Sequence, residues 1–172
     1  CAMAVGVIGS LIHAVASITF KADQTISGTV INFLAAGSTL YMVKLFFEGA
    51  GETPLLDGFK KIPVPGLSTY LAIVLVIVIY FVLFKTPFGL RLRAVGEHPS
   101  AADTLGVNVN KMRYIGVMLS GLLAGIGGAT ITLTTTGTFA HNTISGQGFI
   151  AIAAMIFGKW NPLGAFGAAV FF

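Results

Sequence analysis

Charged residues are scarce in this chain of 172 residues. They make up 9% of the sequence, whereas a soluble domain carries about 25%. Hydrophobic residues make up 55%, and the mean hydropathy is +0.90. A soluble fold could not bury so much apolar surface, so lipid must solvate much of the chain. The composition therefore predicts a membrane protein.

Cysteine is almost absent as well. The single cysteine, Cys1, excludes an internal disulfide and any cysteine-based metal site. The three histidines, His13, His98 and His141, are far apart and lack the spacing of a zinc motif. The sequence also contains neither a phosphate-binding Gly-Lys-Ser/Thr loop nor a Gly-x-Ser-x-Gly motif. We therefore expect no metal, no cofactor and no enzymatic activity in the chain itself.

Carboxylates are missing from three long apolar runs, residues 1–20, 67–84 and 114–136. Carriers driven by protons or sodium usually keep ionisable residues inside their spans, because such residues bind and release the driving ion. This absence argues against an ion-coupled secondary transporter, although that alternative stays open. A membrane scaffold without transport activity is the second alternative.

Long apolar runs are the main positive signal. Each helical residue advances about 1.5 Å, so about 20 residues cross a hydrocarbon core of about 30 Å. The runs that approach or exceed this length are residues 1–20, 28–47, 67–84 and 114–136. Residues 148–158 are too few to span alone, so they form a half-helix or part of a longer span, and residues 163–172 open another span. We expect an all-α, polytopic transmembrane helical bundle.

The ends of the chain both fall inside apolar runs. We therefore interpret residues 1–172 as one transmembrane permease domain, truncated at both ends, of a larger protein.

A basic loop, residues 85–113, separates two of the apolar runs. Five of the ten basic residues lie in it: Lys85, Arg91, Arg93, Lys111 and Arg113. The positive-inside bias places this loop in the cytoplasm. Topology thus explains the net charge of +4 better than a nucleic-acid partner does, and we expect no nucleic acid. The nearly neutral residues 48–66, rich in proline and glycine, fit the outer face.

The basic loop contains a pattern typical of a short helix. Pro99 suits the first helical position, and Gly106 suits the position just after the last one. Between them, Ala101, Ala102 and Leu105 are expected to form one compact apolar face. We interpret this helix as a docking element for another subunit. The alternative is a re-entrant loop that packs on its own bundle.

Small residues follow at helical spacing. Gly121 and Gly125 form a GxxxG motif, and Ala124 and Gly128 form a second pair of small residues four apart. In lipid, such ridges let helix backbones approach closely, and packing then supplies the association energy. The pattern predicts close packing without saying which helix is the partner.

Polar residues within the apolar runs are expected to face the interior of the bundle, because an unpartnered polar group in lipid is costly. These residues are Asn32, Gln147 and Thr134 to Thr136. Contact with a solute and contact with another helix remain equally open for them.

Two segments carry a family resemblance. GLRLRAVGEHPSAADTLGVNV, at residues 89–109, and GQGFIAIAAMIFGKWNPLGA, at residues 146–165, are similar to the permease subunit of bacterial ABC importers of the branched-chain amino acid, ribose and nucleoside group. The similarity is greatest to permeases for nucleosides or simple sugars that work with lipoprotein binding proteins. It covers residues 85–172 well and residues 21–84 loosely.

The resemblance implies partners and sites. The expected partners are two cytoplasmic ATP-binding subunits, a second permease subunit (identical or not) and an extracytoplasmic solute-binding protein, in the inner membrane of a bacterium. Residues 148–158, which include Phe149, would lie near the translocation path, for which Asn32 and Gln147 are further candidates because of their polarity. The residues implied in coupling to the ATPase are Gly96, Glu97, Pro99, Ala101, Ala102, Leu105 and Gly106.

Overall fold

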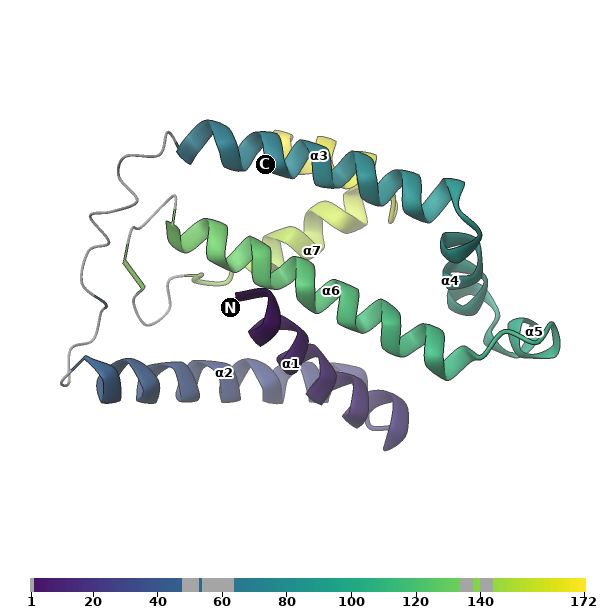
Figure 1. Cartoon of the computed structure of the whole chain (residues 1–172), viewed down its shortest axis with the longest axis horizontal. Helices are drawn as coiled ribbons and strands as arrows, with labels where there is room; N and C mark the ends of the chain where they lie inside the picture. Colours follow the sequence, from purple (N-terminus) through teal and green to yellow (C-terminus); the bar gives the residue numbers. More distant parts are fainter. Residues whose placement is uncertain (1, 48–52, 54–63, 134–137, 140–143) are drawn as a thin grey trace. The chain divides into compact units, whose positions relative to one another are not determined.

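The computed structural model describes residues 2–47, 53, 64–133, 138, 139 and 144–172, and helices dominate it (Figure 1). The helices are α1 (Ala2–Ala14), the π-helix η1 (Val15–Thr19), α2 (Gln24–Phe46), α3 (Val64–Lys85), α4 (Pro87–Glu97), α5 (Pro99–Thr104), α6 (Val109–Ile131), α7 (Gln147–Phe157) and α8 (Pro162–Phe171). No strand occurs among these described residues. The expected all-α fold is confirmed.

Four helical segments are long and apolar enough to cross a membrane: Ala2–Thr19, Gln24–Phe46, Ser68–Lys85 and Val109–Ile131. Few of their residues are buried inside the protein, and none in the window within Ser68–Lys85 is. Large apolar side chains such as Val74 and Ile77 are more than half exposed. Such exposure is compatible with stability only where lipid or another subunit covers it. The chain is a multi-pass membrane protein.

The chain divides into two compact units. The first comprises residues 1–62 and 108–143, and the second comprises residues 63–107 and 144–172.

In the first unit, α1 packs against α6 in the antiparallel direction. Ala2, at the start of α1, lies beside Gly125, whereas Thr19, at the end of η1, hydrogen-bonds the hydroxyl of Tyr114. The π-helical turn is defined by a bond from the Phe20 backbone N–H to the carbonyl oxygen of Val15, at 3.2 Å.

Helix α2 begins at a well-formed cap in the same unit. The Asp23 carboxylate accepts hydrogen bonds from the backbone N–H groups of Thr25 (2.8 Å) and Ile26 (3.2 Å). A side-chain hydrogen bond of 3.0 Å between His13 Nδ1 and Ser27 Oγ links α1 to α2. At the other end of this unit, the Phe139 N–H donates to Thr53 Oγ1 at 2.8 Å, and the Thr53 N–H donates to the Phe139 carbonyl at 3.0 Å.

Helix α6 begins earlier than the sequence predicts. We expected a span from residue 114 to 136, but the helix starts at Val109 because Asn108 caps it: the Asn108 side-chain oxygen accepts from the Lys111 N–H at 3.1 Å. Lys111 and Arg113 therefore lie in its first turns rather than in the loop before it. Long basic side chains at a helix end can extend to the membrane surface.

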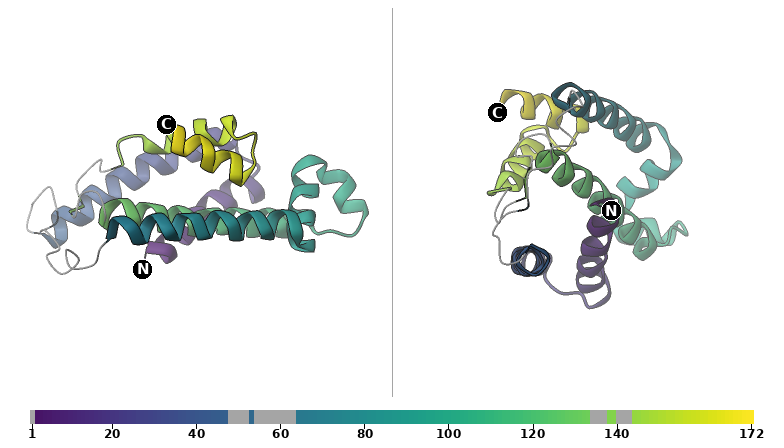
Figure 2. Two further views of the ribbon diagram at one scale, coloured as in Figure 1. Left: turned by 90° about the horizontal axis from the view of Figure 1, so that it is seen from above. Right: turned by 60° about the vertical axis from the view of Figure 1, so that its left-hand side comes forward.

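The second unit holds α3, α4, α5, α7 and α8. Helix α4, which the sequence patterns did not predict, follows α3 directly and turns sharply away from its axis (Figure 1). Helices α7 and α8 form a hairpin, and α8 runs alongside α3 in the opposite direction (Figure 2). In the hairpin turn, a Cβ at Gly158 would overlap the backbone of Gly164 and Ala165. Residues 148–158 thus belong to a half-helix.

Candidate functional site

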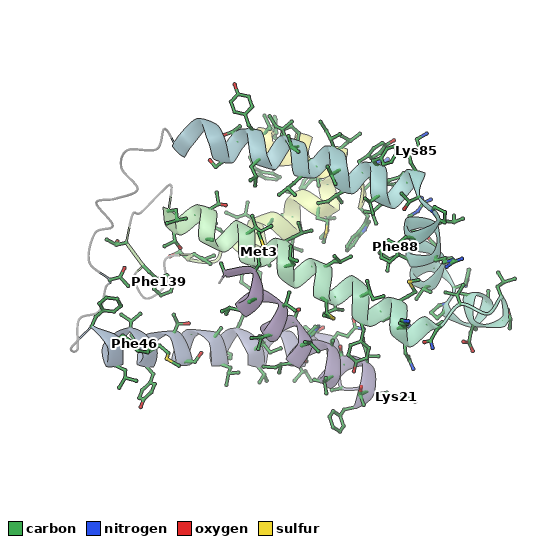
Figure 3. The ribbon with its side chains drawn as sticks, in the orientation of Figure 1. Met3, Lys21, Phe46, Lys85, Phe88 and Phe139 are labelled. Carbon is green, nitrogen blue, oxygen red and sulfur yellow. The ribbon has the colours of Figure 1, made fainter. Side chains whose placement is uncertain are left out.

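The bend between α3 and α4 is built around Thr86. Its hydroxyl donates to the carbonyl oxygen of Val82 and accepts from the Gly89 N–H at 3.2 Å, which caps α4. Pro87 occupies the first helical position. Lys85 and Phe88 lie on either side of the bend (Figure 3). These local contacts explain why α3 ends and α4 begins within two residues.

Gly89 allows α4 to approach α3 very closely. A Cβ at this position would overlap the carbonyl oxygens of Val82 and Leu83. Further along α4, the guanidinium carbon of Arg93 lies 4.5 Å from the centroid of the Phe84 ring, a cation–π arrangement. The two helices are thus joined at two points.

Helix α5 ends in a Schellman motif. The Gly106 N–H donates to the Asp103 carbonyl at 2.9 Å, and the Val107 N–H donates to the Ala102 carbonyl at 3.1 Å. Gly106 has a φ of +79°, which glycine adopts without a steric penalty. Pro99 is the first residue of α5 and Gly106 follows its C-cap, Leu105, at the positions that the sequence pattern indicates.

The expected single apolar face of α5 is wrong in one member. Ala102 is only 3% exposed, whereas Ala101 is exposed and Leu105 is 84% exposed. Residues 101 and 105 share a helix face because they are four apart, and residue 102 is rotated by about 100° from residue 101. Ala102 therefore anchors α5 to its own unit, while Ala101 and Leu105 remain available to a partner. We call these two residues the α5 outer face.

The other residues implied in coupling lie around the junction of α4 and α5. Gly96 and Glu97 are the last two residues of α4, and both are exposed. Pro99 is half-buried. All seven implied residues lie within residues 96–106, so their proximity follows from the sequence, and their role in coupling remains a prediction.

Three of the four basic residues that the structure describes in the first unit lie at one end of it, whereas the fourth, Lys44, lies in the last turn of α2. Because Thr19 bonds Tyr114, the connection between η1 and α2, which contains Lys21, lies at the same end as Lys111 and Arg113 (Figure 3). Phe46 lies at the opposite end of α2 (Figure 3). This arrangement adds Lys21 to the basic side of the membrane and agrees with the positive-inside bias.

Gly121 and Gly125 of the GxxxG motif pack against α1. A Cβ at Gly121 would overlap the Ser10 side chain, and one at Gly125 would lie 2.5 Å from the Ala2 carbonyl oxygen. A Cβ at Gly6 would overlap the Gly121 carbonyl oxygen in turn. We did not predict this partner stripe, although the spacing Ala2-x3-Gly6-x3-Ser10 could have indicated it.

The second pair of small residues has no such neighbour. Ala124 is exposed, and a Cβ at Gly128 would meet no atom within 4 Å. Gly128 lies seven residues after Gly121, hence on nearly the same face, but beyond the point where Ala2 meets Gly125. Its role in packing remains a prediction.

The candidates for the translocation path are dispersed over the two units. Asn32 is exposed on α2 of the first unit. Gln147, the first residue of α7, is exposed, and Phe149 is 71% exposed, both in the second unit. Thr134 to Thr136 lie outside the described residues.

The hydrogen bond between His13 and Ser27 was not predicted from the sequence, because neither residue belongs to a recognisable motif.

Among the described residues, no group of three or more histidine, cysteine, aspartate or glutamate side chains is placed so that it could bind a metal ion.

Comparison with known proteins gives relatives along the whole chain. The chain is 54% identical to the guanosine ABC transporter permease protein NupQ of Bacillus subtilis, over 99% of this chain and 59% of that protein. It is 46% identical to the nucleoside ABC transporter permease protein NupC of Lactococcus lactis, over 98% of this chain and 58% of that protein. It is 31% identical to the putative glucose ABC transporter permease protein TsgC13 of Haloferax volcanii, over 93% of this chain and 53% of that protein. The chain thus spans less than two thirds of these relatives.

No solved structure matches the chain significantly. The family described as "Branched-chain amino acid transport system / permease component" matches residues 1–172. With relatives that cover nearly the whole chain, the resemblance of the two segments at residues 89–109 and 146–165 is confirmed, and this chain belongs to that permease family.

Proposed function

We propose that the chain belongs to a membrane-spanning permease subunit of an importer that is driven by ATP hydrolysis on partner subunits, and that its solute is a nucleoside. The solute is inferred from NupQ and NupC, whose names specify guanosine and nucleosides. These two relatives share more identity with the chain than the putative glucose permease does, which favours a nucleoside over a simple sugar. We place the protein in the inner membrane of a bacterium.

The observation that carries the coupling to ATP-binding subunits is the form of α5. The helix is closed at its end by the Schellman motif and anchored by Ala102, while Leu105 is 84% exposed. A short, well-closed helix that presents a small and a large apolar side chain fits a groove on a second protein. We propose that the α5 outer face docks on a cytoplasmic ATP-binding subunit.

Transport then follows from a change in the position of α5. Closure of two ATP-binding subunits moves α5 and tilts the attached span, so that the path opens alternately to the two sides of the membrane. Such a cycle moves solute only if the two states differ in affinity for it. A solute-binding protein on the outer side delivers the nucleoside, and a second permease subunit, identical or different, completes the path. Asn32, Gln147 and Phe149 are proposed to line it.

The test uses the complete protein, expressed with its ATP-binding subunits. The double variant Ala101→Glu/Leu105→Glu places two charges on the α5 outer face. We expect these charges to abolish copurification of the ATP-binding subunits and to lower ATP-dependent uptake of radiolabelled guanosine at least tenfold. The matched control Ala101→Ser keeps a small side chain and should retain both.

Unchanged uptake in the double variant, with the protein still in the membrane, would contradict docking through α5. Uptake that survives ATP depletion and collapses with an ionophore would instead identify an ion-coupled carrier. A complete complex that takes up no solute would favour the scaffold.

A further inference from the structure

We infer that α3, α4 and α5 form one rigid lever, held by a joint that consists of Phe84, Thr86, Gly89 and Arg93 (the α3–α4 joint). The mechanical role of this lever rests on the proposed function, because the lever would pass motion of the docked α5 to a membrane span. Its rigidity rests on the contacts alone. The joint residues are thus positioning residues for transport rather than residues that touch the solute.

The first attachment lies in the first turn of α4. Any Cβ at Gly89 would overlap the carbonyl oxygens of Val82 and Leu83, so backbone lies against backbone. Backbone atoms cannot move aside by a change of rotamer, as the far end of a side chain can. The two bonds of the Thr86 hydroxyl, to the Val82 carbonyl and from the Gly89 N–H, fix the same turn. This attachment leaves little freedom for α4 to slide on α3.

The second attachment lies one turn further along α4. The Arg93 guanidinium lies over the Phe84 ring, and that ring stacks on Tyr80 with centroids 5.0 Å apart. Gly89 and Arg93 are four residues apart, about 6 Å along the helix axis. Two attachments at separate points resist rotation of α4 about the bend, which a single attachment would permit.

The lever continues from α4 into α5. The His98 N–H donates to the Ala94 carbonyl at 3.0 Å, and the Ala102 N–H donates to the His98 carbonyl at 3.1 Å, so hydrogen bonds run through the junction. Val95 of α4 and Ala102 of α5 are each 3% exposed. A displacement applied at the α5 outer face therefore reaches α3 without a loose connection.

A geometric experiment tests the rigidity without any partner subunit. Nitroxide labels are placed at position 78 on α3 and position 104 on α5 of the complete protein, whose native cysteines are replaced by serine, in lipid nanodiscs. Val78 and Thr104 are both exposed, so the labels should not disturb packing. Pulsed electron paramagnetic resonance then gives the distribution of distances between the labels. We expect one narrow distribution.

Two variants should loosen the joint, and one matched variant should not. Gly89→Ala forces α4 away from α3, and Arg93→Met removes the cation but keeps an unbranched apolar side chain. Each should broaden or shift the distribution. Arg91→Met removes the same charge from the same helix, at an exposed position away from the Phe84 ring, and should leave the distribution unchanged. If the Gly89→Ala variant fails to fold, the Arg93→Met variant still shows whether the α3–α4 joint controls the distance between the labels.

A transport measurement tests the mechanical role. In vesicles that contain the complete complex, both joint variants should still copurify with the ATP-binding subunits, but the guanosine imported per ATP hydrolysed should fall at least fivefold. A merely structural defect would lower uptake and hydrolysis together and leave this ratio unchanged. The joint variants thus differ from Ala101→Glu/Leu105→Glu, which should lose the subunits themselves.

A broad distribution in the unaltered protein, or one that neither joint variant changes, would overturn the rigid lever. An unchanged ratio of guanosine to ATP in both joint variants would overturn its role in transport. If the unaltered complex imports no guanosine with ATP, the proposed function fails, and the label distances still decide whether the lever is rigid.

Discussion

Single glycines set the closest approach in the first unit. Gly6, Gly121 and Gly125 bring α1 and α6 so near that an added methyl group would strike the backbone or a short side chain of the other helix. In lipid, the apolar side chains are not surrounded by water, so helices gain no hydrophobic free energy when they associate. Their association therefore depends on close packing. At the scale of the residue, the missing side chain is therefore the stabilising feature.

Gly6→Val tests this packing. The valine side chain would overlap the Gly121 carbonyl oxygen, and overpacking of this kind costs about 1–3 kcal/mol. We expect that loss in the free energy of unfolding, measured by titration with a denaturing detergent. Gly9→Val is the matched control, because a Cβ at Gly9 meets no atom within 4 Å. Equal losses for the two variants would show that helix propensity, and not the contact with α6, determines the cost.

The sequence predicted some elements well because their signals are local. Pro99 and Gly106 mark the ends of α5, and the apolar runs mark the spans. Helix α4 was missed because it is short, basic and held by a backbone contact between Gly89 and α3. The GxxxG motif predicted close packing, but its partner stripe on α1 lies more than a hundred residues away. No local pattern can carry such a contact.

The C-terminal cap of α5 gives a prediction at the scale of the element. Gly106→Ala keeps the helix but forces alanine into the left-handed region, which costs about 1–2 kcal/mol. We expect hydrogen exchange of the α5 amides to accelerate about 5- to 30-fold, since 1.4 kcal/mol corresponds to a factor of ten. Gly96→Ala, inside α4 with open space around its Cβ, should not accelerate it. Equal exchange in both variants would contradict the role of the cap.

At the scale of the whole molecule, helix direction and charge agree in the first unit. Helix α1 and η1 run antiparallel to α6, so the connection that holds Lys21 lies at the basic start of α6. Helix α2 then returns and ends near Phe46 at the other side. Lys85, Arg91 and Arg93, which precede α6 in the sequence, favour the same orientation by the positive-inside bias. The distribution of basic residues was therefore predictable from the sequence, whereas the pairing of α1 with α6 was not.

Labelling tests this orientation in intact cells. Single cysteines at positions 22 and 110 should react with a membrane-impermeant maleimide only after the cells are permeabilised, because both lie at the basic end. A cysteine at position 47, just after α2, should react from outside. Reaction of position 110 in intact cells would invert the topology and remove the basis for docking α5 in the cytoplasm.

The π-helical turn at Val15–Thr19 accommodates one residue more than a regular α-helix would need to cover the same distance. Its hydrogen bonds join residues five apart instead of four. Each side chain after the turn is therefore rotated by about 100° about the helix axis from the direction that it would have if α1 continued as a regular helix. That offset directs Thr19 to Tyr114. Deletion of Ala16 would remove this extra residue, so a regular helix of better backbone geometry would still direct Thr19 to Tyr114, and the hydrogen bond between the two helices would survive.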